Sequence, residues 1–111
     1  MKPALWRSSA ERDAAEAAYW YATQAGLAVG ERFLTAVETG IAHLSQHPAS
    51  GSPRYALPLN LDGMRFWPVG GFPYLIFYIE HDTHLDIWRV LHAQRDVPAW
   101  MGRGNRSEHV Q

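Results

Sequence analysis

Residues 85–96 read LDIWRVLHAQRD, a mostly apolar run that is followed by polar side chains in close succession. His92 is the residue in this run that suits proton chemistry, because an imidazole titrates near neutral pH. The alternative for His92 is a strand-end imidazole that is hydrogen-bonded to backbone. Arg95 and Asp96 belong either to a working surface or to a surface ion pair beside a helix start, where an acidic residue is favoured.

Two other pairs of histidines have spacings that occur in metal sites or in turns. His43 and His47 lie four residues apart, a spacing that can bind zinc on a helix, but histidines in a last helical turn also complement the helix dipole. His81 and His84 flank a short polar turn, where polar residues are expected in any case. No carboxylate motif accompanies the first pair, so the sequence predicts neither a metal site nor a cofactor.

The 111-residue chain has room for one domain, expected over residues 1–100, with a flexible tail over residues 101–111. Its hydrophobic fraction of 47% supports a packed core, and five Trp, five Tyr and four Phe indicate an aromatic core or an aromatic binding surface. The formal net charge of -1 argues against bulk electrostatic binding of nucleic acid. Cysteine is absent, and the N-terminus lacks an apolar run long enough for a signal peptide or membrane span, so we expect a cytoplasmic protein.

The first half of the sequence predicts a short strand and two helices. Residues 3–8 have strand-like content, and the capping box that begins at Ser8 should start a helix over residues 10–25. Gly26 is placed to stop this helix in a left-handed cap, and apolar periodicity predicts a second helix over residues 27–45. The two helices should form an antiparallel hairpin.

The second half predicts a long loop and a three-stranded meander. Residues 48–63 contain three prolines and two glycines, and a connection of this length is a candidate contact region. Three strand-like segments follow over residues 64–92. In the middle strand, alternation puts Leu75, Phe77 and Ile79 on one face and Tyr74, Ile76 and Tyr78 on the other. We expect the helix hairpin to cover the first face, with Leu75, Phe77, Phe33, Val37 and Ile41 buried between. The predicted fold class is α+β, a small and mostly meander antiparallel sheet in the order β-α-α-β-β-β with the hairpin on one face.

This order of elements resembles the ParE branch of the RelE/ParE family of bacterial toxins over about residues 3–100. The most specific part is FPYLIFYIEHDTHLDIWRVLHAQRD, residues 72–96, where family members similarly show an aromatic strand, a short turn, and a strand ending in Val-Leu-His, a spacer and Arg-Asp. HPASGSP, residues 47–53, also looks like the family's pattern. The resemblance implies a type II toxin-antitoxin toxin of the plasmid stabilisation kind, neutralised by a ParD-like antitoxin. Its ParE members poison DNA gyrase, whereas its RelE members cut mRNA on the ribosome.

The choice between these two branches depends on catalytic side chains. Metal-free RNA cleavage needs groups that activate the ribose 2′-hydroxyl, neutralise the phosphate and protonate the leaving oxygen. The resemblance places Arg65 and Arg95 where RelE-like enzymes carry basic residues, and His92 could act as an acid or base. Trp67 and Tyr74 stand where further basic residues would be expected. The catalytic set is therefore incomplete, and we expect a non-enzymatic inhibitor of gyrase.

Three functions stay open at this point. The leading one is inhibition of DNA gyrase by protein contact, through the residues Arg65, Trp67, Tyr74, His92 and Arg95. The second is ribosome-dependent mRNA cleavage of the RelE type by Arg65, His92 and Arg95. The third is a non-toxic module that only binds an antitoxin. We expect the last strand to be central or nearly so, and to present His92 and Arg95 beside Arg65 at one edge of the sheet.

The antitoxin is expected to be acidic, to form a hetero-oligomer with this chain, and to contact at least one of Arg65, Arg89 and Arg95. The full set of expected antitoxin-binding residues is Ala14, Ala18, Tyr21, Arg65 and Arg89. Arg89 shares strand parity with Leu85, Ile87 and Leu91, so we expect it to be a paired, partly buried charge. Direct contact with nucleic acid or a membrane is not expected.

Overall fold

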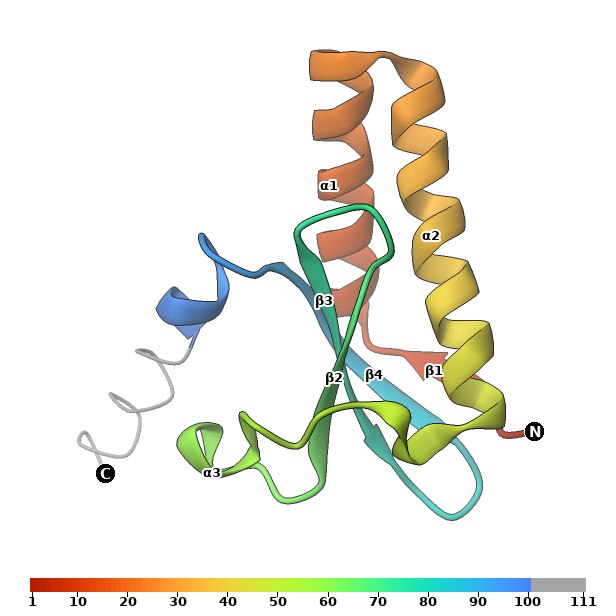
Figure 1. Cartoon of the computed structure of the whole chain (residues 1–111), viewed down its shortest axis with the longest axis vertical. Coiled ribbons are helices and arrows are strands. Elements are labelled where there is room, and N and C mark those ends of the chain that lie inside the picture. The colour runs from red at the N-terminus through yellow and green to blue at the C-terminus, as the bar shows by residue number, and fades with distance from the viewer. Residues whose placement is uncertain (101–111) are drawn as a thin grey trace.

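The computed structural model describes residues 1–100, and the predicted flexible tail lies outside the described residues. The fold is α+β, as predicted, with a helix hairpin against a four-stranded sheet (Figure 1). The elements in chain order are β1 (Ala4–Trp6), α1 (Ser8–Ala25), α2 (Leu27–Gln46), the 3-10 turn η1 (Pro48–Ser50), α3 (Ala56–Leu59), β2 (Met64–Pro68), β3 (Tyr74–Glu80) and β4 (Leu85–His92).

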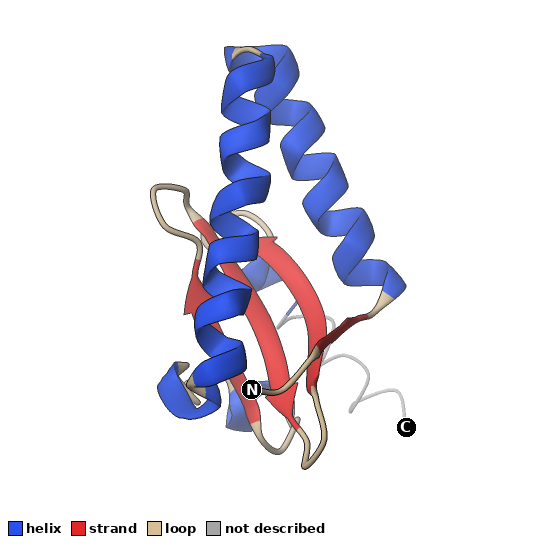
Figure 2. Ribbon diagram, turned by 90° about the vertical axis from the view of Figure 1, so that its right-hand side faces the viewer, coloured by secondary structure: helices blue, strands red, loops and turns tan. Residues whose placement is uncertain are grey.

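The two long helices are connected through Gly26, and they extend well beyond the end of the sheet (Figure 2). Gly26 has φ 105° and ψ 154°, a positive φ that suits glycine but not the left-handed helical cap that we predicted. The predicted capping box is also wrong, because Arg7 is the N-cap residue and no side chain caps α1. The Ser9 hydroxyl instead donates to the Trp88 carbonyl of β4 at 3.1 Å, so the first turn of α1 is tied to the sheet.

The strands lie in the order β1-β4-β3-β2, which makes β4 a central strand, as predicted. β1 runs parallel to β4, while the pairs β4–β3 and β3–β2 are antiparallel and form the predicted meander. The end of β4 therefore lies between the start of β3 and the N-terminal half of α1, where polar side chains from three elements can meet. Within residues 1–100, no helix is both long enough and apolar enough to cross a membrane.

The prediction for the two faces of β3 is wrong. Tyr74, Ile76 and Tyr78 pack in the core under the helix hairpin, where Phe33, Val37 and Ile41 are buried as expected. Leu75 and Phe77 belong to a second core on the other face, with α3 and the segment 97–100. Strand alternation separates the faces correctly, but both faces are covered, so apolarity alone could not tell which one meets the helices.

A β-bulge in β4 explains why simple alternation fails along the last strand. Phe77 pairs with Arg89 but Tyr78 pairs with Ile87, so Trp88 is an extra residue on β4. Ile87 and Val90 consequently both belong to the core under the hairpin, whereas Leu91 belongs to the second core. The strand parity that we assumed for Arg89 is therefore broken at the bulge.

Candidate functional site

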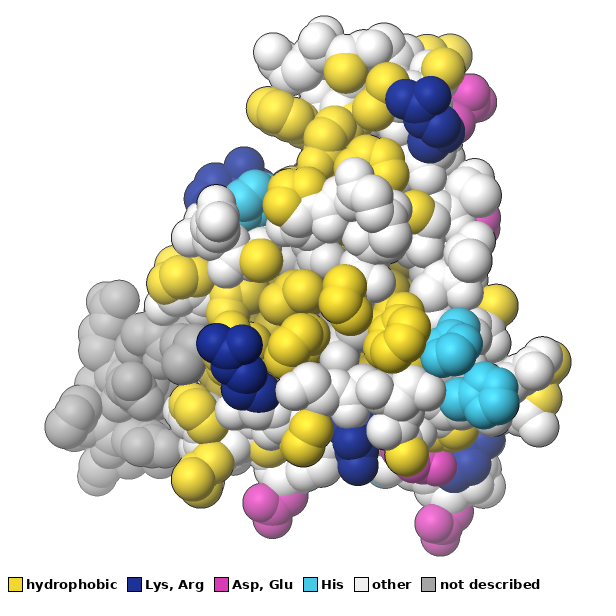
Figure 3. Space-filling view, in the orientation of Figure 1, with side chains coloured by type: hydrophobic (Ala, Val, Ile, Leu, Met, Phe, Trp, Pro, Cys, Tyr) yellow, Lys and Arg dark blue, Asp and Glu magenta, His cyan; other side chains and the backbone are white. Residues whose placement is uncertain are grey.

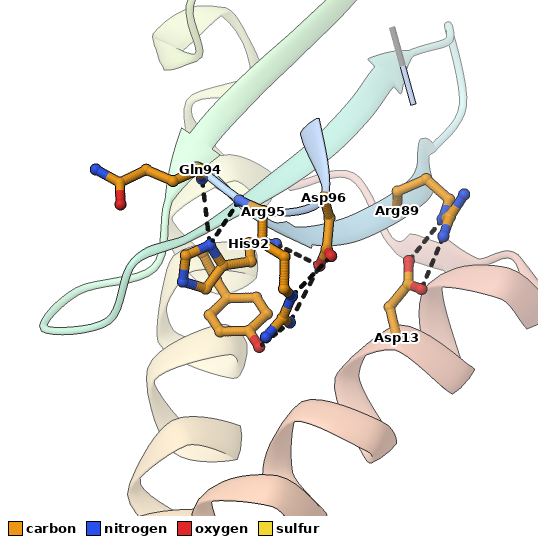
Figure 4. A network of polar contacts seen from close by, with 7 residues as sticks. Asp13, Arg89, His92, Gln94, Arg95 and Asp96 are labelled. Atoms are coloured by element: carbon orange, nitrogen blue, oxygen red, sulfur yellow. Dashed lines mark hydrogen bonds and ion pairs between the residues drawn. The ribbon is translucent and has the colours of Figure 1, made fainter. Parts of the chain in front are cut away.

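The turn that follows β4 is organised around the His92 ring (Figure 4). Nδ1 of His92 accepts hydrogen bonds from the backbone amides of Gln94 and Arg95, at 3.2 and 3.1 Å. The backbone amide of His92 donates to Oδ2 of Asp96 at 3.0 Å. Because Nδ1 is the acceptor in both bonds, the tautomer that makes them has its N–H group at Nε2. The interpretation of His92 as a strand-end imidazole bonded to backbone is confirmed.

Arg95 and Asp96 form an ion pair that also reaches β3. Nε of Arg95 donates to Oδ1 of Asp96 at 3.0 Å, and Nη2 of Arg95 donates to the Tyr74 hydroxyl at 3.2 Å. Burial disfavours the charged form of Asp96, but hydrogen bonds from Arg95 and from the His92 amide outweigh it, so the pKa of Asp96 lies below its ordinary value. The pair is thus fully charged at neutral pH, while the Arg95 side chain stays 60% exposed.

Arg89 is paired with Asp13 across the boundary between β4 and α1. Nε and Nη2 of Arg89 donate to the two carboxylate oxygens at 2.6 and 3.0 Å, and the Val90 amide donates to the same carboxylate at 3.0 Å. The side chains are 24% and 11% exposed, which confirms the prediction of a paired, partly buried charge. We missed Asp13 in the sequence, although it lies one turn before the buried Ala17 and so on the apolar side of α1.

These two ion pairs line a cleft of about 360 Å³ between α1 and the end of β4. The side chains that matter for its chemistry are Asp13, Glu16, Trp20, Tyr74, Arg89, Arg95 and Asp96. Three carboxylates against two guanidinium groups leave this lining with one net negative charge. We call it the α1–β4 cleft. Neither guanidinium of this lining is left without a carboxylate partner.

Arg65 lies away from this cleft, and its expected position beside His92 and Arg95 is wrong. Arg65 pairs with Tyr78 in the sheet, four residues along β3 from Tyr74, which pairs with His92. Four residues of strand correspond to roughly 13 Å. Nη1 of Arg65 instead donates to the carbonyls of Gly51 at 2.7 Å and Ala49 at 3.3 Å. Arg65 therefore holds the loop that follows α2.

Tyr78 fastens the same loop from inside the core. Its hydroxyl donates to the Pro48 carbonyl at 2.6 Å and accepts from the Gly51 amide at 2.9 Å. A Cβ atom at Gly51 would lie 2.7 Å from Cε1 of Tyr78 and 2.9 Å from the Phe66 carbonyl, so glycine is required there. The start of the predicted contact loop, residues 48–63, is thus held to the sheet, while Leu57 in the same loop is 89% exposed.

Trp67 is partly buried against the core under the hairpin and stacks on His43, with ring centroids 4.6 Å apart. The rings of His43 and His47 are 5.1 Å apart. In the described part of the chain, no group of three or more His, Cys, Asp or Glu side chains could hold a metal ion. Trp67 lies opposite Ile76 in the sheet, so it does not join Tyr74 at the end of β4.

The alanine face of α1 is turned inward. Ala14 and Ala18 are 5% and 8% exposed, and Tyr21 packs its ring against those of Phe33 and Tyr74. These residues hold α1 to α2 and the sheet, so the Ala14 and Ala18 side chains are not displayed to a partner. The exposed large apolar residues of the hairpin are instead Tyr19, Trp20, Leu27 and Leu34. Figure 3 shows further apolar side chains gathered over the face of the sheet.

The sequence matches a family model described as the ParE toxin of a type II toxin-antitoxin system, parDE, over residues 4–97. The chain therefore belongs to the ParE toxin family, which confirms the resemblance seen in the sequence. A solved structure from the chromosomal ParDE toxin-antitoxin system of P. aeruginosa is similar, with a TM-score of 0.71 and 16% identity, over 85% of this chain and 98% of that one. At this identity the likeness shows a shared fold. No curated protein matches the sequence.

Proposed function

We propose that this ParE-family protein inhibits DNA gyrase by protein contact and is neutralised by a ParD-like antitoxin. Membership of the toxin family supports a toxin-antitoxin role. The observation that carries the mechanism is the pairing of both arginines in the α1–β4 cleft with carboxylates, Arg89 with Asp13 and Arg95 with Asp96. Charges compensated in this way serve to shape a contact surface.

The same observation argues against the alternative of mRNA cleavage. A scissile phosphate needs uncompensated positive charge in the transition state, whereas the cleft lining carries one net negative charge. The proposed nuclease set of Arg65, His92 and Arg95 is also divided, because Arg65 bonds to loop carbonyls at the other end of β3. Nδ1 of His92 is already occupied by two backbone amides. A nuclease would have to rebuild this site on the ribosome.

The antitoxin is expected to cover apolar surface that the fold leaves open, including Trp20, which is 50% exposed, and Tyr19, which is 72% exposed. Three arginines were expected to meet acidic residues of the partner. The Arg95 side chain is 60% exposed, whereas that of Arg89 is 24% exposed and Arg65 is partly buried. An acidic antitoxin segment should therefore contact Arg95 first. Such a segment would order itself on the toxin as it binds.

The test of mechanism is a gyrase supercoiling assay run beside a ribosome-bound mRNA cleavage assay, both with the purified protein. We expect supercoiling to stop, or cleaved DNA to accumulate, while the mRNA stays intact. Arg95→Ala should weaken inhibition, and Arg32→Ala, a change at an exposed arginine on α2, should leave it unchanged. Codon-specific mRNA cleavage would overturn the proposal and support the alternative hypothesis of a RelE-type nuclease.

The test of the partner is co-expression with the small acidic protein encoded next to this gene, where one is found. Co-expression should rescue growth, raise the soluble yield and slow amide exchange in the hairpin or at the sheet edge. The neighbouring protein could bind this chain and slow its amide exchange although this chain affects neither gyrase nor mRNA. That result would identify a non-toxic antitoxin-binding module. A neighbour that neither binds nor protects would refute the partner proposal.

A further inference from the structure

Most of the charged groups in the α1–β4 cleft already have partners. The Asp13 carboxylate accepts two hydrogen bonds from Arg89 and one from the Val90 amide. The Asp96 carboxylate accepts from Arg95 and from the His92 amide. Glu16 is the third carboxylate of the lining, and it makes no ion pair with any residue in 1–100. The net negative charge of the cleft is therefore that of Glu16.

An aromatic ring stands beside this carboxylate. Trp20 follows Glu16 by four residues on α1, so the two side chains lie on the same side of the helix, and both line the cleft. Trp20 is 50% exposed although it is one of the largest apolar residues of the chain. Ala17, Val90, Leu91 and Ala99 complete the apolar part of the lining. A carboxylate without a direct ion pair, an exposed indole and apolar walls in one cleft are the features that bind a long cationic side chain.

We propose that the α1–β4 cleft receives a basic side chain of the antitoxin, with arginine preferred, whose cation lies on the Trp20 ring and hydrogen-bonds to Glu16. This inference rests on the proposed function, in that an antitoxin covers this surface. A guanidinium fits better than an ammonium because it is planar, stacks on an indole and can bond a carboxylate through two N–H groups. The volume of about 360 Å³ is at the small end of ligand sites, which suits one side chain.

The proposal defines the charge pattern of the partner. An acidic side chain in the cleft would face the Glu16 carboxylate, which has no ion-pair partner within residues 1–100, so acidic residues of the antitoxin should lie outside the cleft, on the exposed side of Arg95. A segment that is acidic overall would thus carry one base at the position that enters the cleft. The single basic residue within an acidic segment would fix the register of that segment on α1 and exclude antitoxins that lack this residue.

The experiment uses the full chain, labelled with ¹⁵N, and N-acetyl-arginine amide as the probe. N-acetyl-citrulline amide is the matched control, because it has nearly the same shape without the charge. Arginine amide should shift the indole N–H signal of Trp20 and the backbone signals of residues 16–20 in a saturable way, and citrulline amide should not. Equal shifts with both compounds, or a stronger response to N-acetyl-glutamate amide, would overturn the proposal.

Variants separate the site from general surface charge. Glu16→Gln should weaken binding of the arginine probe about tenfold, the effect of losing one charge-assisted hydrogen bond, and Trp20→Leu should weaken it as well. Glu31→Gln removes an exposed carboxylate from α2 and should change nothing. Unchanged binding in both cleft variants, with spectra that show a folded protein, would refute the proposal. The probe needs no antitoxin, so failure here with intact antitoxin binding would sink this inference and leave the proposed function standing.

Discussion

Replacing Tyr78 with Phe should destabilise the protein through one lost hydroxyl. The side chain is fully buried, and its hydroxyl connects the Gly51 amide at 2.9 Å with the Pro48 carbonyl at 2.6 Å. Removal leaves both backbone groups without this partner, and a buried polar group left unsatisfied costs about 1–3 kcal/mol. Against a total of about 5–15 kcal/mol for a small domain, this loss is large enough to measure. The ring itself stays in the core under the hairpin.

The same variant should change the response to alkaline pH. Burial raises the pKa of Tyr78 above its ordinary value of 10.0, an effect that exceeds the opposing contributions of Gly51 and Arg65. The folded protein then holds the phenolic proton more tightly than the unfolded chain does. This contribution to stability is complete below pH of about 10 and is lost as the pH rises through the pKa of the folded state. Tyr78→Phe should lack this alkaline loss.

The assay is urea denaturation followed by circular dichroism, with amide exchange at Gly51 as a local readout. We expect a lower midpoint at unchanged slope, faster exchange of the Gly51 amide, and a shallower fall in stability above pH of about 10. Tyr19→Phe is the matched control, because Tyr19 is 72% exposed and should change stability little. A loss below about 0.5 kcal/mol in Tyr78→Phe, with Gly51 exchange unaltered, would show that the hydroxyl does not hold the loop.

Three further predictions concern the second core and the turn after β4. Phe77→Ala should cost about 3–5 kcal/mol in urea denaturation, because Phe77 is fully buried, and a loss below about 1 kcal/mol would contradict its place in the core. His92→Ala should lower stability by about 1–2 kcal/mol, since two backbone amides lose their acceptor. His92→Asn keeps a side-chain oxygen and should recover part of this loss. Equal losses in the two variants would argue against the acceptor role of His92. Because the pKa of Asp96 is lowered in the folded protein, the stability that Asp96 contributes is present above its unfolded pKa and is lost as the pH falls through its folded pKa. Asp96→Asn should therefore reduce the loss of stability below pH of about 4. An unchanged acid profile would count against the pairing with Arg95.

Local signals in the sequence were sufficient for the elements and their order. The apolar periodicity of α2, the break at His47-Pro48 and the turn at Gly70-Gly71 each act over a few residues, so the helix hairpin and the meander could be predicted from them. The motif that ends β4 likewise pointed to the ParE family, which the family model confirms. Even the paired state of Arg89 followed from the cost of burying a lone charge.

The faces of the sheet were decided only by tertiary structure. β3 is apolar on both sides, so its sequence carries no preference for the side on which the hairpin packs. The two tyrosines can lie under the helices because their hydroxyls reach partners outside the strand, Pro48 and Gly51 for Tyr78 and Arg95 for Tyr74. Those partners come from segments distant in the sequence, and periodicity does not report them.

The composition of the candidate site was also a tertiary result. Arg65, His92 and Arg95 are similar in type, but antiparallel register puts Arg65 at the opposite end of β3. Asp13, Glu16 and Trp20 enter the cleft because β1 runs parallel to β4, so that α1 passes beside the end of β4. Residues almost eighty positions apart, such as Asp13 and Arg89, meet through this topology. The sequence alone determined which charged and aromatic groups the protein has, and the packing of α1 against β4 determined which of them act together.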